Sequence, residues 1–221
     1  MHRARHGAAV AGKHDGMTLQ KRLFDVFFSL LLMVVLGPVI LVLVIWLYLK
    51  QGRPLFYVAE RMKTPEQAFG LVKFRTMTVV AHDQGVSGAH KASRVTPMGK
   101  RLRAKRLDEF PQLWNILKGD LSFVGPRPPL REYVQRFPDV YGPVLRSRPG
   151  VTGLATIRFH KHEERLLLRC VSAAQTDDVY SRICVPRKAK LDLIYQRHQS
   201  ICYDFSIVFQ TIANLFQRPK E

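Results

Sequence analysis

The sequence is poor in cysteine and carries few of the usual catalytic signatures. Its three cysteines, Cys170, Cys184 and Cys202, are widely spaced and form no CxxC pair. This spacing argues against a disulfide framework or a zinc site and fits a reducing compartment. The chain also lacks HExxH, GxSxG, Walker and Rossmann patterns, so the common protease, hydrolase and nucleotide-fold motifs are missing.

Acidic residues are scarce as well. There are 17 Asp plus Glu against 35 Lys plus Arg, for a formal net charge of +18. Such an excess implies an anionic partner, which composition alone leaves open as nucleic acid, an acidic lipid surface or a phosphorylated substrate. The 221 residues are enough for one domain and a membrane element. We expect residues 1–20, which are small, polar and basic, to form a disordered tail.

One long apolar segment runs from Leu23 to Leu49, interrupted only by Asp25 and Ser29 as clearly polar residues. A helix of this length can cross a hydrocarbon core of about 30 Å. Gly37-Pro38 lies at its middle, where proline removes a backbone donor and kinks or breaks a helix.

Basic residues flank both ends of this segment, and positive flanks favour the cytoplasmic side of a membrane. Both ends therefore favour the same side. A simple spanning helix remains open, but the pattern favours a re-entrant membrane helix over residues 21–50, broken at Gly37-Pro38. The flanking residues are Lys21 and Arg22 before the segment and Lys50, Arg53, Arg61 and Lys63 after it.

The rest of the chain predicts an α+β fold that is mostly helical. Two segments have strand character and are joined by a loop containing Pro65, which predicts a small β-hairpin. A basic run over residues 94–106 predicts a short helix at the membrane surface. The predicted elements are strands 55–60 and 69–76, a mobile loop at 82–93, a helix from about Asp108 to Lys118, a short helix at 130–137, and one or two amphipathic helices within 190–217.

Asp108 and Glu109 are the acidic pair most able to do chemistry. An Asp at a helix start is commonly only a cap, and that interpretation stays open. This pair, however, follows a run of six basic residues and precedes Arg127 and Arg131. Carboxylates in a cationic patch suit a divalent metal and a phosphorylated substrate, and an aspartate can attack phosphorus directly.

Four further cations are candidates for phosphate contacts. Arg127 lies in the stiff turn GPRPP, where the prolines fix the backbone and aim the guanidinium. Arg148 begins the loop RPGVTG, whose backbone N–H groups can cradle an anion. Lys73 and Arg75 alternate with Phe74 on a predicted strand and therefore share a face. For each of them a plain turn or a solvent-exposed face is the competing interpretation.

Several segments, taken in order, resemble the bacterial sugar transferase family, the small monotopic phosphoglycosyl transferases that act on polyprenyl phosphate. The block at 94–128 is the most specific, and the resemblance covers most of residues 21–216. The matching stretches are KRLFDVFFSLLLMVVLGP (21–38), KFRTM (73–77), RVTPMGKRLRAKRLDEFPQLWNILKGDLSFVGPRP (94–128), RPGVTGLA (148–155) and KLDLIYQRHQSICYDFSIVFQTI (190–212).

The resemblance implies a cytoplasmic phosphoglycosyl transferase domain over residues 51–217, held at the bacterial inner membrane by a re-entrant helix. Asp108 would attack the sugar-attached phosphate of a UDP-sugar, release UMP and form a covalent phosphosugar intermediate. Polyprenyl (undecaprenyl) phosphate would then attack that intermediate. Glu109 would assist the second step or hold the metal environment, and Mg²⁺ would contact Asp108. Lys73, Arg103 and Arg127 match positions that contact phosphate or substrate.

Residues 156–188 depart from the family pattern, which usually has an Asn-Gly-Arg type sequence where this chain reads TIRFHKHEER. Because this region bears on sugar selection, the sugar is left open. The chain has the length expected of the minimal catalytic form, and a homodimer is kept open.

Two alternatives remain: a membrane-tethered nucleic-acid binder and a scaffold without catalysis. The basic run at 94–106 has no interleaved aromatic residue, which argues against nucleic acid as a partner. A scaffold gives no reason for an acidic pair among cations.

Overall fold

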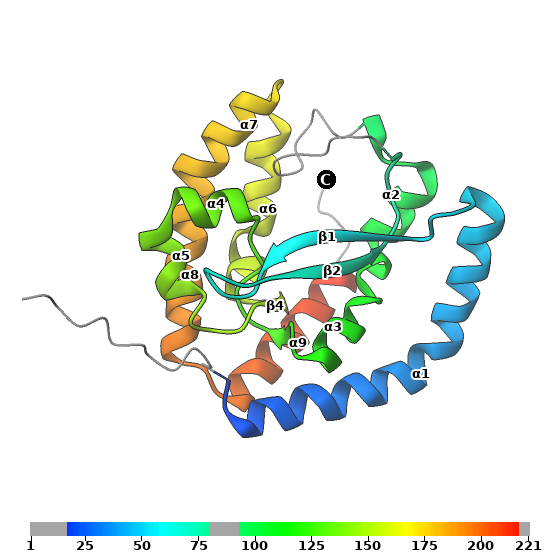
Figure 1. The fold of residues 1–221 in the computed structure, drawn as a ribbon, viewed down its shortest axis with the longest axis horizontal. Coiled ribbons are helices and arrows are strands. Elements are labelled where there is room, and N and C mark those ends of the chain that lie inside the picture. The colour runs from blue at the N-terminus through cyan, green and yellow to red at the C-terminus, as the bar shows by residue number, and fades with distance from the viewer. Residues whose placement is uncertain (1–16, 80–92, 217–221) are drawn as a thin grey trace, which may run out of the picture.

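The computed structural model describes residues 17–79 and 93–216. Residues 82–92 of the predicted loop and residues 1–16 of the predicted tail lie outside this range, whereas residues 19 and 20 of that tail begin a helix. The fold is α+β and mostly helical, with two small two-stranded sheets (Figure 1). The elements are α1 (Leu19–Gln51), β1 (Phe56–Met62), β2 (Ala68–Phe74), α2 (Pro97–Ala104), η2 (Leu107–Glu109), α3 (Gln112–Lys118), β3 (Ser122–Val124), α4 (Arg131–Arg136), α5 (Pro138–Val144), β4 (Gly150–Thr152), α6 (Leu154–Leu168), α7 (Ala173–Val179), η3 (Tyr180–Cys184), α8 (Val185–Arg197) and α9 (Ile201–Phe216).

Helix α1 is long and apolar. Thr18 caps its start by accepting a hydrogen bond from the backbone N–H of Lys21. The predicted break at Gly37-Pro38 is wrong in detail, because the helix continues through Pro38. Proline deletes only one backbone donor, so neighbouring turns hold the helix together while it bends. Figure 1 shows this bend near the middle of α1. Among the described residues, α1 is the one helix long and apolar enough to cross a membrane.

Both halves of α1 pack on the same domain. In the first half, Leu32 and Met33 pack against the core cluster that contains Leu71 and Ile116. In the second half, Leu43 and Leu47 join a cluster with Phe74 and Leu102. The opposite side of the helix is exposed and apolar, and this set includes Leu23, Phe27, Leu31, Val34, Val35, Val42, Ile45 and Leu49.

A buried polar cluster fixes the start of α1 to the end of the chain. Lys21 forms an ion pair with Asp204 of α9, and both side chains are almost completely buried. The Tyr195 hydroxyl donates to Asp204 at 2.7 Å and lies 3.2 Å from the Lys21 Nζ. One turn further along α1, Asp25 accepts hydrogen bonds from the Ser122 hydroxyl and the Phe123 backbone N–H. These contacts join α1, β3 and α9 into one unit.

We expect Lys21→Met to lower the free energy of unfolding by about 3–5 kcal/mol, because it leaves Asp204 buried without its cation. Lys118→Met is the control, since the Lys118 side chain is about half exposed and its pairing with Asp120 contributes little. Chemical denaturation of both purified proteins in detergent micelles measures the difference. Equal stability of the two variants would contradict the proposed anchor.

The predicted β-hairpin is confirmed. Strands β1 and β2 are antiparallel, with Phe56 opposite Phe74 and Met62 opposite Ala68. The second sheet was not predicted: β3 and β4 form a parallel pair of three residues each. It brings the GPRPP turn against the RPGVTG loop so closely that a Cβ on Gly125 would lie 2.2 Å from the Arg148 carbonyl oxygen. Glycine is required there because no side chain fits.

The predicted helix at 108–118 is divided. A 3₁₀ turn, η2, carries Asp108 and Glu109, and α3 begins only at Gln112. The expected end is confirmed, with Gly119 in the left-handed conformation at φ 82°. Within α3, Ile116 is fully buried, whereas Trp114 is 56% exposed.

The remaining helices form the other side of the domain. The predicted helix at 130–137 is α4, and Pro138 then begins α5. The amphipathic region at 190–217 corresponds to two helices, α8 and α9. Phe205 and Phe209 of α9 are exposed, and the Phe205 ring packs edge-on against Phe24 and Phe28 of α1. The exposed apolar surfaces of α1 and α9 are therefore continuous.

Candidate active site

The acidic pair lies on η2, directly after a residue with an unusual backbone. Arg106 has φ 53° and ψ 23°, a left-handed conformation that is uncommon outside glycine. This conformation turns the chain sharply between α2 and η2. Strained backbone of this kind is often found at functional sites.

Glu109 is the counter-ion of three cations that come from three parts of the chain. Its carboxylate lies 3.1 Å from Arg127 Nη2, 3.5 Å from Lys73 Nζ and 4.0 Å from Arg106 Nη1. Burial alone would raise the pKa of Glu109, but these three cations outweigh it and hold the pKa at about 2. Glu109 is therefore ionised at neutral pH and serves as the counter-ion of these cations.

The carboxylate of Asp108 has a different environment. It is 7% exposed, and among the residues that the structure describes no side chain pairs or hydrogen-bonds with its carboxylate. Burial, and then the neighbouring charge of Glu109, raise its pKa, while Lys73 and Arg103 act in the other direction. A carboxylate that is both buried and unpaired is available to react.

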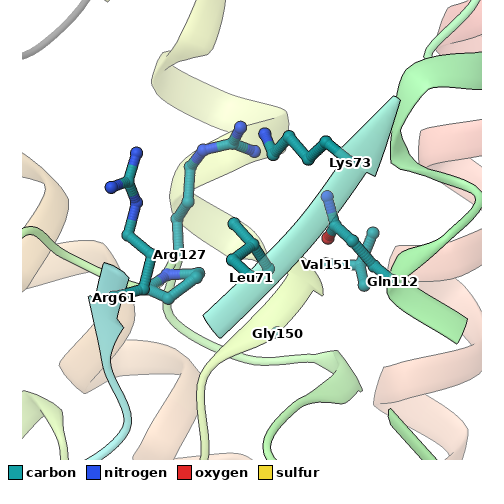
Figure 2. A pocket seen from close by; sticks show the side chains of 8 residues that line it. Arg61, Leu71, Lys73, Gln112, Arg127, Gly150 and Val151 are labelled. Carbon is teal, nitrogen blue, oxygen red and sulfur yellow. The ribbon is translucent and has the colours of Figure 1, made fainter. Parts of the chain in front are cut away.

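Two of the cations that pair with Glu109, Lys73 and Arg127, also line a small pocket. Figure 2 shows Lys73 of β2 and Arg127 of the GPRPP turn converging over it, with Arg61 at its edge and Gln112 on the side of α3. Burial lowers the pKa of Lys73 to about 8, and repulsion from Arg127 and Arg61 adds to this effect against the attraction of Glu109 and Asp108. The three cations that line the pocket are Arg61, Lys73 and Arg127, and their charge exceeds the single negative charge of Glu109. The pocket therefore favours an anion.

The other predicted cations lie in different places. Arg103 is close enough to Asp108 to affect its pKa, and its Nε donates to the Thr76 hydroxyl at 2.9 Å. Arg75 does not reach the pair: its guanidinium donates to the carbonyls of Gln51 and Gly52 at 2.6 and 3.1 Å. Its position just past the end of β2 directs it to the end of α1.

Arg148 is also remote from the acidic pair. Its Nη1 lies 3.2 Å from the Met17 sulfur and would be 3.3 Å from a Cβ on Gly119. Gly119 ends α3, whereas Asp108 precedes its start, so the two lie at opposite ends of that helix. Arg148 therefore lies between the segment just before α1 and the end of α3.

Sequence reasoning missed three contributors to the site. Arg61 lines the pocket, Arg106 neighbours Glu109, and Gln112 lines the pocket with its side chain almost completely buried. Arg106 belongs to the basic run that was recognised, but its special backbone has no sequence signal. Gln112 follows Asp108 by four residues, one helical turn, and that spacing was a usable signal.

The site can be compared with known proteins. A family model described as bacterial sugar transferase matches residues 16–218. The chain belongs to the bacterial sugar transferase family. The Asp108–Glu109 pair, its cations and both halves of α1 all fall inside the matched range.

Three relatives of this sugar transferase show which sugars are named for similar proteins. A UDP-glucose:undecaprenyl-phosphate glucose-1-phosphate transferase of Caulobacter vibrioides is 37% identical over 89% of this chain and 70% of its own. A transferase of the same description from Klebsiella pneumoniae is 33% identical over 89% of this chain and 40% of its own. An Aeromonas hydrophila UDP-N-acetylgalactosamine-undecaprenyl-phosphate N-acetylgalactosaminephosphotransferase is 31% identical over 88% of this chain and 43% of its own. The chain spans about two fifths of the length of the latter two, and the differing sugars leave its own sugar undetermined.

The described residues contain no group of three or more His, Cys, Asp and Glu side chains that could hold a metal ion. Glu109 is already engaged by its cations, which leaves Asp108 as the carboxylate for a metal. Mg²⁺ commonly binds through one or two carboxylates together with substrate phosphates and waters. The donor set at this site fits that mode and does not form a cage made of protein alone.

Proposed function

We propose that this sugar transferase moves a sugar-1-phosphate from a UDP-sugar to polyprenyl phosphate and releases UMP. The observation that carries the proposal is that the two carboxylates of the acidic pair have different environments. Glu109 holds the cations, while Asp108 is buried, unpaired among the described residues and close enough to Lys73 of the cationic pocket to interact with it electrostatically. This arrangement combines a nucleophile with charge stabilisation for a transferring phosphoryl group.

The reaction has two displacements at one phosphorus atom. An Asp108 carboxylate oxygen bonds to the sugar-bearing phosphorus, and the bond from that phosphorus to the bridging oxygen of the diphosphate breaks. UMP leaves with the electron pair. A phosphate oxygen of the polyprenyl phosphate then bonds to the same phosphorus, and the Asp108 carboxylate is released. Lys73 and Arg127 hold phosphate oxygens in both steps, and the excess positive charge of the pocket stabilises them.

Asp108 is also the residue that would hold Mg²⁺, together with phosphate oxygens of the substrate. The ion would supply additional positive charge to the phosphate oxygens. The residues of the chain act independently of that contribution: Lys73 and Arg127 orient the phosphates, Glu109 fixes those two cations, and Asp108 presents its carboxylate to the phosphorus.

The re-entrant membrane arrangement is part of the proposal. The packing of both halves of α1 on one domain supports this arrangement, since both halves would then lie on that domain's side of the membrane. The continuous exposed apolar surface of α1 and α9 supports contact with lipid. The acceptor is a lipid phosphate, so the site must lie at headgroup level. We place the domain on the cytoplasmic face of a bacterial inner membrane.

The test incubates the purified protein with Mg²⁺, undecaprenyl phosphate and a panel of UDP-sugars. We expect UMP and a diphosphate-linked lipid sugar from at least one donor. Release of UDP would mean that the sugar moves without its phosphate, and the proposal would be wrong. Turnover of no donor in a panel that includes the glucose and N-acetylgalactosamine donors would also count against it.

Membrane topology gives a separate prediction. Gln20 precedes most of α1 and Glu66 lies in the turn between β1 and β2, and both are exposed. Single cysteines at these positions, in a Cys202→Ser background, should react with a membrane-impermeant maleimide only when the cytoplasmic face is accessible. We expect identical behaviour at both positions. Labelling from opposite faces would instead establish a simple span.

The pH dependence follows from Lys73, whose pKa is held at about 8. Lys73 is charged below this pKa and loses its charge as the pH rises through it. We therefore expect kcat/KM for UMP release to fall above pH about 8, because this ratio reports groups of the free enzyme. Lys73→Arg should remove this decline, since arginine stays charged. An unchanged alkaline limb in Lys73→Arg would assign it to another group.

A further inference from the structure

Gln112 is a buried polar side chain with no role in the two displacements described above. It is 3% exposed and lines the pocket together with Arg61, Lys73 and Arg127. Figure 2 shows its amide pointing into the pocket. Among residues 17–79 and 93–216, no group accepts or donates a hydrogen bond to that amide. The amide is therefore available for a hydrogen bond to a group bound in the pocket.

The backbone places Gln112 next to the nucleophile. Phe110 and Pro111 both have right-handed helical conformations, so the chain continues helically from η2 into α3. Only three residues of compact, helix-like backbone separate Asp108 from Gln112, so the two lie within about one turn of each other. Lys73 connects the two, since it lines the pocket with Gln112 and interacts electrostatically with Asp108.

The chemistry of the pocket identifies the partner. The charged groups that line it are all cations: burial is the main cause of the lowered pKa of Lys73, and repulsion from Arg127 and Arg61 adds to it. A neutral amide adds a donor without adding to this repulsion. The phosphorus that carries the sugar has two non-bridging oxygens, and each has lone pairs for more than one hydrogen bond while charge develops on it. Lys73 and Arg127 supply charged donors to these oxygens, and Gln112 stands beside them as a neutral one.

We infer that the Gln112 amide N–H donates a hydrogen bond to a non-bridging oxygen of the phosphoryl group as it passes to and from Asp108. This inference rests on the proposed function and adds a catalytic residue to it. Gln112 exchanges no proton. Its hydrogen bond strengthens as charge develops on that oxygen, so it lowers the barrier more than it strengthens substrate binding.

The experiment compares Gln112→Met, which keeps size and neutrality but removes the donor, with Gln67→Met on the exposed hairpin turn. Steady-state UMP release is followed with UDP-glucose and with UDP-N-acetylgalactosamine. We expect Gln112→Met to lower kcat by about 10²-fold, as the loss of one preorganised donor does elsewhere, with KM changed by less than about 3-fold. The factor should be the same for every donor that the unaltered protein accepts. Gln67→Met should match the unaltered protein.

Gln112→Glu provides the second variant, because it is nearly isosteric and places a carboxylate beside the phosphate. It should lower kcat at least as much as Gln112→Met does. Normal kcat in either folded variant would overturn the inference, and so would a loss that differs between the sugars, which would make Gln112 a sugar contact. If the unaltered protein releases no UMP from any donor, the proposed function has failed and this inference fails with it. Normal turnover in the Gln112 variants rejects the inference alone.

Discussion

Asp108→Asn should lower UMP release by about 10⁴-fold or more while leaving the protein at least as stable as before, because removing a catalytic nucleophile costs losses of this order. The asparagine amide has the same shape but is not a nucleophile at phosphorus. Burial and the neighbouring Glu109 raise the pKa of Asp108, so its charge is unfavourable where it sits. Replacing it with a neutral group removes that cost. Catalysis and stability should therefore change in different directions.

The control for this variant is Asp139→Asn, an exposed aspartate in the first turn of α5. It should keep full turnover and unchanged stability. A thermal melt of each protein, recorded next to the UMP assay, separates loss of the nucleophile from loss of the fold. Asp108→Asn with normal turnover would remove Asp108 from the proposed mechanism.

The same residue predicts a chemical intermediate. Without polyprenyl phosphate, the unaltered protein should release about one UMP per active site and then stop, because only the first displacement can occur. Digestion and mass analysis should place the phosphosugar on the peptide that carries Asp108. Product formation that always requires both substrates at once, with no adduct at Asp108, would instead indicate a single displacement.

Local elements of the fold were largely predictable, because their patterns depend on neighbours in sequence. The apolar run of α1, the two strands of the hairpin and the end of α3 at Gly119 all follow from such patterns. The parallel pair β3 and β4 was missed because strands of three residues show no usable alternation. The Lys21–Asp204 ion pair joins residues 183 positions apart, and no local pattern predicts such a contact.

The candidate site was predictable in its chemistry but not in its geometry. The acidic pair, Lys73 and Arg127 do come together, because the hairpin and the GPRPP turn both face η2. Arg75 and Lys73 were expected to share a face, but β2 ends at Phe74, so strand alternation no longer governs Arg75. Glu109 pairs with the cations and Asp108 does not, and this difference depends on distances of a few ångströms. Sequence patterns do not contain such distances.

Arg127→Met should lower kcat/KM for UMP release by about 10³-fold, the lower end of what one arginine supplies in phosphoryl transfer. The Arg127 side chain remains about 40% exposed while it contacts Glu109, so it can reach both the counter-ion and a bound phosphate. Loss of Arg127 also removes a cation that repels Lys73 and leaves the negative charge of Glu109, so the pKa of Lys73 should rise. The alkaline limb of the pH profile should therefore move upward in this variant.

Arg131→Met is the matched control. Arg131 follows Arg127 by four residues and pairs at 2.8 Å with Glu60 on β1, where both side chains are substantially exposed. Exposed pairs contribute little, so turnover and the pH profile should stay unchanged. A comparable loss in both variants would mean that general positive charge on this face matters and that Arg127 has no special contact. A loss confined to Arg127→Met, together with the upward shift of the alkaline limb, would place its guanidinium on the reacting phosphate and next to Lys73.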